Sequence, residues 1–163
     1  MSQTVLFVAY ADGILDNVFR FPNSWGSGAM IWTALCKKYL KPDPTQPHMM
    51  EFFPSPMVDW PRIWKYDKDG GAMVSWERNT LITTYDRTIV ERKDMLAVAA
   101  SLDLFHSEYV DQCPVSTLAA QAAAIRFAYE KGAVAIAWQQ TTVSDAWMVT
   151  QDEDENPVYY NVL

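Results

Sequence analysis

Two adjacent amide side chains are the first residues in this sequence whose type and position suggest chemistry. Gln139 and Gln140 close the apolar run 133–138. Amides at the end of a buried strand can hydrogen-bond a small ligand or the edge of a nucleobase. They suit equally a hairpin end, where backbone groups need side-chain partners. The sequence leaves both roles open.

The loop before a predicted helix at 29–40 is the best candidate for an anion site. Asn23 and Trp25 lie there among turn-forming residues, and Gly26 and Gly28 follow. Glycines at a helix N-terminus let backbone N–H groups approach a ligand where the helix dipole favours negative charge. The alternative is a plain turn in which Ser27 caps the helix and Trp25 packs into the core.

An acid and a base stand next to each other directly after the β-rich segment 80–85. Asp86 and Arg87 could orient a substrate at the end of a strand, or they could form a local salt bridge, which contributes little when exposed. With Asp12 and Gln139 they define an enzyme or nucleotide-binding alternative. That alternative predicts that these four side chains converge on one pocket.

Negative charge is concentrated in the second half of the chain. The 163 residues carry 13 Lys and Arg against 20 Asp and Glu, a net charge of −7. Residues 1–93 are nearly neutral, whereas residues 94–163 hold ten acidic and two basic residues. This acidity argues against a nucleic-acid-binding surface. The acidic run at 152–155 is either a solvated loop or a surface for a basic partner protein.

Sequence motifs for common cofactors are absent. There is no P-loop, no GxGxxG after the first strand, no HExxH, no GxSxG and no CxxC. We therefore expect no cofactor and no metal site. His48 and His106 are interpreted as structural or solvent-exposed residues. Cys36 and Cys113 are predicted to be buried thiols of a cytosolic protein.

Targeting signals are also not evident. The N-terminus lacks the basic flank of a signal peptide, and the apolar stretch 5–11 is too short for one. No run approaches the eighteen apolar residues of a membrane-spanning helix. The sequence therefore predicts a cytoplasmic protein without a membrane segment.

The elements that must position these residues indicate one domain over 1–163. We predict an α+β or α/β fold, a two-layer sandwich of about five strands and three to four helices, with the helices mostly on one face. The last three strands are expected to form an antiparallel meander. The predicted strands are 5–10, 80–85 with an extension to 90 left open, 133–138, 146–149 and 158–162. The predicted helices are 29–40, a short one from Asp59, 92–106 and 117–131.

A tryptophan pair could contribute an aromatic contact surface. Trp60 and Trp64 are one helical turn apart and therefore lie side by side. Tryptophan is enriched in protein-binding hot spots, so the proline-rich segment 54–64 could be exposed for a partner. The alternative is that both rings belong to the core.

Three stretches together resemble small bacteriophage-encoded accessory proteins to which no reaction is assigned. They are residues 23–26 running into 31–36, residues 83–87 with 90–92, and residues 138–144. The resemblance implies expression in a bacterial cytoplasm and an action on host machinery or host defence. It carries over no catalytic residue. A fainter similarity, in helix 117–131, strand 133–138 and Gln139-Gln140, is to small phage enzymes that cleave S-adenosylmethionine.

We therefore expect a binding protein that modulates or inhibits a host protein with a basic surface, with no direct contact to nucleic acid or membrane. Two alternatives stay open: an enzyme or nucleotide-binding protein, for example of the S-adenosylmethionine-cleaving type, and a phage structural or assembly component. The candidate binding residues are Asn23, Trp25, Asp86, Arg87, Gln139, Gln140, Asp152, Glu153, Asp154 and Glu155.

Overall fold

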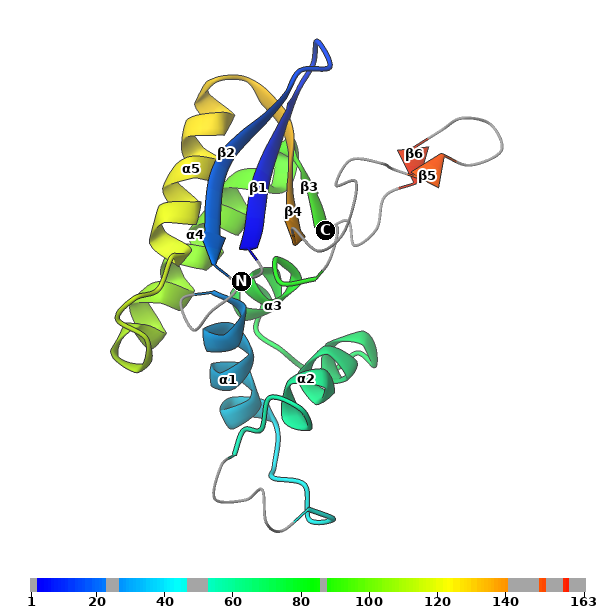
Figure 1. Ribbon diagram of the computed structural model, residues 1–163, viewed down its shortest axis with the longest axis vertical. Helices are drawn as coiled ribbons and strands as arrows, with labels where there is room; N and C mark the ends of the chain where they lie inside the picture. The colour runs from blue at the N-terminus through cyan, green and yellow to red at the C-terminus, as the bar shows by residue number, and fades with distance from the viewer. Residues whose placement is uncertain are drawn as a thin grey trace.

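The computed structural model describes residues 3–22, 27–46, 53–85, 88–140, 150–151 and 157–158. These residues form an α+β fold, which confirms the predicted class (Figure 1). Five α-helices are present among them, more than the three to four expected. No described helix has both the length and the apolar character needed to cross a membrane.

A four-stranded sheet forms one layer. Its strands are β1 (Gln3–Tyr10), β2 (Leu15–Pro22), β3 (Thr88–Glu91) and β4 (Ala133–Gln140), in the order β2-β1-β4-β3. All three neighbouring pairs are antiparallel. The two apolar runs of the sequence are thus the two central strands, β1 and β4, as their continuous hydrophobicity predicts.

Two long helices form the second layer on one face of the sheet (Figure 1). They are α4 (Arg92–Tyr109) and α5 (Leu118–Glu130), joined through the short 3-10 helix η2 (Val110–Gln112). Apolar side chains of both helices meet those of the central strands in a single core, where Leu102, Ile125 and Ile136 are fully buried. Burial of this apolar surface is the main stabilising term of the fold.

Three further helices extend beyond one end of the sheet (Figure 1). They are α1 (Gly28–Tyr39), α2 (Asp59–Lys68) and α3 (Ser75–Ile82). Helix α2 packs on α1, and α3 packs on both α1 and α4. Helix α3 therefore links this group to the main two-layer body.

The strand predicted at 80–85 is wrong. Helix α3 runs to Ile82, and β3 begins only at Thr88. The threonines that suggested a strand are satisfied in another way, because the Thr80, Thr83 and Thr84 hydroxyls donate to backbone carbonyls three or four residues earlier. Such local bonds allow β-branched residues to occupy helical and turn positions.

Strand β2 was not predicted, because only part of it alternates. It is an edge strand: Phe21 is buried and Phe19 half-buried, whereas Asp16 and Arg20 are exposed. A tight turn joins it to β1, with Gly13 at φ +82°, a conformation that side chains other than glycine rarely adopt. The result is a β1–β2 hairpin instead of an irregular loop.

The predicted C-terminal meander is wrong for β4. Strand β4 pairs with β1 on one edge and β3 on the other, so neither edge is left for the strand that follows it in sequence. Strands β5 (Thr150–Gln151) and β6 (Pro157–Val158) instead pair with each other in a separate antiparallel sheet. The predicted strand 146–149 and most of 158–162 lie outside the described residues.

Candidate functional site

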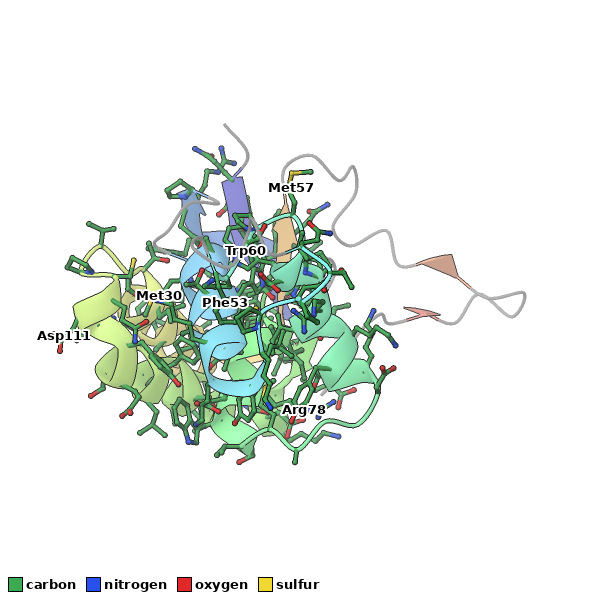
Figure 2. All side chains as sticks on the ribbon, turned by 90° about the horizontal axis from the view of Figure 1, so that it is seen from below. Met30, Phe53, Met57, Trp60, Arg78 and Asp111 are labelled. Carbon is green, nitrogen blue, oxygen red and sulfur yellow. The ribbon has the colours of Figure 1, made fainter. Side chains whose placement is uncertain are left out.

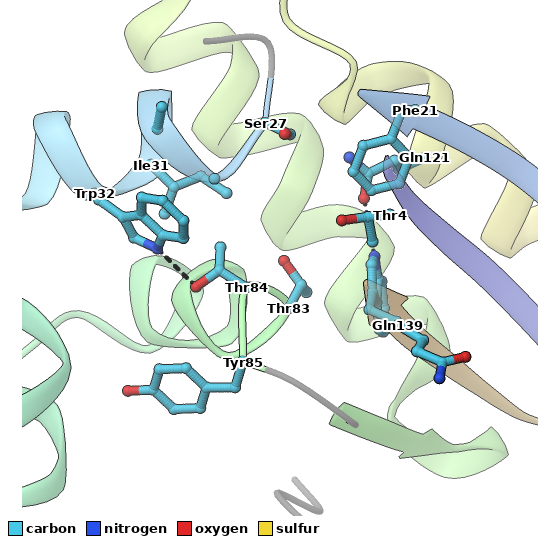
Figure 3. Close-up of a pocket in the computed structure, with 13 residues that line it drawn as sticks. Thr4, Phe21, Ser27, Ile31, Trp32, Thr83, Thr84, Tyr85, Gln121 and Gln139 are labelled. Atoms are coloured by element: carbon cyan, nitrogen blue, oxygen red, sulfur yellow. Dashed lines mark hydrogen bonds between the residues drawn. The ribbon is translucent and has the colours of Figure 1, made fainter. Parts of the chain in front are cut away.

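A small pocket opens where the sheet, helix α1 and the turn after α3 meet (Figure 3). Its walls come from several parts of the chain that are far apart in sequence. They are the first turns of α1, the turn 83–85, the adjoining ends of β1 and β4, Phe21 of β2 and Gln121 of α5. Within the described residues the volume of the pocket is about 40 Å³, room for a few water-sized groups.

A tryptophan fixes one wall of the pocket. The indole N–H of Trp32 donates to Thr84 Oγ1 at 2.9 Å, and the Thr84 hydroxyl donates in turn to the Leu81 carbonyl at 2.6 Å (Figure 3). The ring lies directly over Gly28, where an added Cβ would come within 2.8 Å of it. The glycine thus gives the indole the space that it needs to form this wall.

An amide network fixes the floor. Trp138 is buried, and its indole N–H donates to Gln121 Oε1 at 2.9 Å. The Gln121 amide N–H donates to Thr117 Oγ1 at 3.1 Å. Strand β4 is therefore tied to the first turn of α5 beneath the pocket. Since a buried amide without partners is costly, both ends of Gln121 being satisfied makes this floor rigid.

The described lining carries no acid, histidine, lysine or arginine. The Ser27 and Thr83 hydroxyls donate to the carbonyls of Pro22 and Thr80. Ser27 therefore does not cap α1 as predicted, and this helix has no side-chain cap. Backbone N–H groups of the first turn, which includes Gly28 and Ala29 of the lining, lack helical partners by geometry.

Gln139 is the candidate residue that lines this pocket, and described neighbours of four other candidates line it as well. Gln139 lines it, and Gln140 ends strand β4 beside it. Phe21 and Ser27, on either side of the loop with Asn23 and Trp25, both line the pocket, and so does Tyr85, directly before Asp86 and Arg87. Asn23, Trp25, Asp86 and Arg87 themselves lie outside the described residues.

Asp12 does not join them. It lies in the β1–β2 turn, where its Oδ1 accepts the backbone N–H of Ile14 at 3.1 Å. The pocket adjoins Thr4 at the other end of β1, and the six residues from Thr4 to Tyr10 span about 20 Å. The prediction that Asp12 shares a pocket with Gln139 is therefore wrong.

The pocket residues that the sequence analysis missed are mostly hydroxyl and aromatic side chains. Trp32, Thr83, Thr84 and Gln121 all occupy helices or helix ends. Their types alone are typical of a helix face or a cap. No spacing rule brings α1, the turn after α3 and α5 together, so only the tertiary structure could identify this set.

The tryptophan pair packs inward instead of forming a contact surface. The Trp60 and Trp64 rings lie against Trp32, with ring centroids 5.0 and 5.2 Å away, and Trp60 donates its indole N–H to Thr33 Oγ1 at 3.2 Å. Both rings are half-buried. Within the described part of segment 54–64, Met57, just before α2, is the large apolar side chain that is exposed (Figure 2).

A buried carboxylate ties three helices together below the pocket. Glu77 of α3 is fully buried and accepts hydrogen bonds from Lys38 Nζ at 2.7 Å, Tyr109 Oη at 2.9 Å and the Tyr39 hydroxyl. Burial and the bond to Glu77 raise the pKa of both tyrosines, and the same carboxylate raises the pKa of Lys38. Because each donor is already paired, this cluster is structural.

The two cysteines are buried and form no disulfide, as predicted. Burial raises the pKa of the Cys36 thiol to about 12. No three His, Cys, Asp or Glu side chains among the described residues gather in a way that could hold a metal ion. His106 is half-buried, and its Nδ1 has no hydrogen-bond partner. His48 lies outside the described residues.

Exposed carboxylates without cationic partners occur on the second layer. Glu108 and Asp111 at the end of α4 and Glu130 at the end of α5 are exposed, and within the described part of the chain no Lys, Arg or His forms an ion pair with them. Asp111 stands at the outer margin of the molecule (Figure 2). The acidic run Asp152, Glu153, Asp154 and Glu155 lies outside the described residues.

No protein-family model matches the chain, and no curated protein or solved structure is significantly similar to it. The resemblance to bacteriophage accessory proteins and to S-adenosylmethionine-cleaving enzymes therefore stays a prediction. Inferences about function therefore rest on the side chains of the pocket and on the exposed carboxylates of α4, η2 and α5.

Proposed function

We propose that this chain is a small acidic accessory protein of the bacterial cytoplasm that binds a host protein through a basic patch on that partner. The single observation that carries the proposal is the set of exposed carboxylates without ion pairs on α4, η2 and α5, namely Glu108, Asp111 and Glu130. Carboxylates that no local cation neutralises create a negative potential that attracts a basic partner.

The remaining charge of the second half supports the same proposal. Ten acidic residues lie in 94–163 against Arg126 and Lys131. Arg126 is already paired with Asp103, and Lys131 lies over the Phe127 ring. Arg126 is thus engaged by a carboxylate of the same layer, and most of the acidic excess of residues 94–163 is free to act on another molecule. A partner that normally holds phosphates would present the matching basic cleft.

Affinity capture tests the proposal. The immobilised chain is mixed with bacterial lysate, and captured proteins are identified by mass spectrometry at low and high salt. One variant combines Glu108→Gln, Asp111→Asn and Glu130→Gln, and a second neutralises residues 152–155. We expect a specific basic protein to be lost at high salt and from at least one variant.

The matched control removes exposed carboxylates from the nearly neutral half. Asp69→Asn with Glu91→Gln deletes two acids that are paired with Lys65 and Lys93 and should leave capture unchanged. If the same partner binds all variants equally at every salt concentration, the acidic-surface mechanism is wrong. Large symmetric oligomers of the free chain in sedimentation would instead favour a structural or assembly role.

A second candidate function is the binding of a small hydrogen-bond acceptor in the pocket. It is favoured by the uncapped first turn of α1, whose Gly28 and Ala29 line a pocket without carboxylates. Such a turn favours an anionic or carbonyl group. Titration with phosphate, acetate and acetamide, followed by the indole N–H resonance of Trp32, tests it: no shift with any of them excludes this role.

A further inference from the structure

The outer surface of the α4–α5 layer carries large apolar side chains that the fold does not cover. Leu96 and Leu104 of α4 are 43% and 52% exposed, and Phe127 of α5 is 57% exposed. Exposed leucines and phenylalanines that share one face are a mark of an interaction surface, whereas scattered single ones need no explanation. Their spacing on the two helices decides between these cases.

The spacing places them on one face. On α4, exposed Leu96, Ala100 and Leu104 follow one another at intervals of four, and exposed Glu108 continues the row. On α5, exposed Ala120, Ala123, Phe127 and Glu130 follow at intervals of three and four. Both rows are therefore continuous apolar stripes that end in a carboxylate.

The two stripes lie beside each other. Helices α4 and α5 pack together along their length, and Arg126 of α5 pairs with Asp103 of α4. Both members of this ion pair are about two-fifths exposed, so it marks the line where the helices meet at the surface. Leu104 directly follows Asp103, and Phe127 directly follows Arg126. The stripes thus lie on either side of this line, which we call the α4–α5 groove; the Asp103–Arg126 pair occupies part of it, and the alanines of the stripes let another backbone approach closely.

The charges at the ends of this groove favour a basic binding partner over a second copy of the chain. Glu108 and Asp111 lie at one end of it and Glu130 at the other, and none of them forms an ion pair among the described residues. The acidic character is strongest at the Glu108 and Asp111 end, because Lys131 follows Glu130 and lies over the Phe127 ring. A second copy of a chain with net charge −7 would bring like charges together. A segment with an apolar face and Lys or Arg toward its ends would instead gain both apolar burial and ion pairs.

We propose that the groove between the exposed faces of α4 and α5 binds an amphipathic helix of a partner protein, with its apolar side on Leu104 and Phe127 and its basic ends on Glu108 and Glu130. This inference rests on the proposed function, because it names the surface and the partner chemistry by which the acidic layer would act. A helix that lays its apolar face, with anchors at i, i+3, i+4 and i+7, on an apolar surface of its receptor is a recurring mode of protein recognition.

A direct binding measurement tests the groove independently of any natural partner. The probe is a fluorescent helical peptide of leucine and lysine, and the comparison peptide replaces lysine by glutamate. Fluorescence anisotropy with the full chain should show binding of the basic peptide alone, and the affinity should fall as salt rises. The double variant Leu104→Ser with Phe127→Ser should weaken that binding about tenfold or more, because the apolar contacts are lost.

The hairpin tip offers a matched control. Ile14 and Leu15 are 55% and 47% exposed, and Ile14→Ser with Leu15→Ser removes two exposed apolar side chains that belong to neither stripe. This control should bind the peptide as the parent does. All four positions are exposed, so circular dichroism and thermal unfolding of the variants should match the parent.

Three results would overturn the groove. The first is that the basic peptide does not bind, and the second is that the Leu104→Ser/Phe127→Ser variant binds it as well as the unsubstituted protein does. The third is that the unsubstituted protein is a dimer in sedimentation and this variant is a monomer, because a second copy would then cover the surface. Peptide binding that depends on Glu108 and Glu130 but not on Leu104 and Phe127 would reject the groove and leave the acidic-surface function standing.

Discussion

Tyr109 donates its phenolic hydrogen to Glu77 across 2.9 Å, and this bond joins the end of α4 to the first turn of α3. Tyr39 and Lys38 of α1 reach the same carboxylate from the other side. One fully buried side chain therefore holds together the helices that form the pocket wall and the helix that carries the acidic surface. Its removal should affect the whole lower half of the molecule.

Glu77→Ala should destabilise the fold by about 2–4 kcal/mol, because it leaves a cavity and takes the acceptor from two half-buried tyrosine hydroxyls, Tyr39 and Tyr109, at once. Lys38→Ala should cost only about 1 kcal/mol, since the Lys38 side chain is 43% exposed and solvent screens its ion pair. Urea unfolding of both variants measures the difference. Equal losses would show that the ion pair, and not the tyrosine bonds, dominates this cluster.

Alkaline pH should weaken the fold through its tyrosines. Burial, with the neighbouring Glu77 or Asp67 carboxylate, raises the pKa of Tyr39, Tyr109 and Tyr85 above the usual value near about 10. The folded state therefore keeps protons that the unfolded chain releases. The stabilising contribution is complete below pH ~10 and is lost as pH rises through the higher pKa values of the folded state.

Urea unfolding midpoints between pH 8 and 11 check this expectation. They should fall in the parent above pH ~10 and fall less steeply in Tyr85→Phe with Tyr109→Phe, which has two fewer perturbed phenols. Tyr10→Phe is the control, because it removes a phenol of β1 that bonds to neither Glu77 nor Asp67, and its pH profile should follow that of the unsubstituted protein. If the urea midpoint of the unsubstituted protein does not change between pH 8 and 11, the tyrosines do not contribute to stability in this way.

The sequence predicted the two central strands and most helices because their apolar residues repeat with a clear period. It failed at residues 80–85, where local hydroxyl bonds and the burial of Glu77, Leu81 and Ile82 in tertiary contacts override the β propensity of the threonines. It failed at β2 because that edge strand has one exposed face and interrupted alternation. In both segments the secondary structure depends on tertiary contacts that no local pattern in the sequence encodes.

The candidate site was partly predictable for a similar reason. Loops rich in turn formers and amides at strand ends could be found as local patterns, and Gln139 does line the pocket. Asp12 shares the residue type of a site but lies at the other end of β1. Thr84 and Trp32 meet across 52 positions in sequence through one hydrogen bond, which no local pattern encodes.

Gly28→Ala should displace the wall of the pocket. A Cβ there would stand 2.8 Å from the Trp32 ring, so the indole must shift and its bond to Thr84 must weaken. The indole N–H resonance of Trp32, assigned with Trp32→Phe, should move. Thermal stability should not rise, although Gly→Ala in a helix otherwise gains up to about 1 kcal/mol. Ala29→Gly alters the same turn without adding a Cβ and should leave the resonance in place.

Cys36 should resist alkylation in the folded protein. Its side chain is fully buried, its thiol donates to the Asp59 carbonyl at 3.3 Å, and burial raises its pKa to about 12. Only the thiolate reacts, and at pH 8 such a thiol is ionised in roughly one molecule in ten thousand. Iodoacetamide labelling followed by peptide mapping should modify Cys36 slowly in buffer and quickly in urea. The contact between α1 and α2 covers the thiol. Equal labelling rates in buffer and in urea would therefore show that the two helices separate in solution.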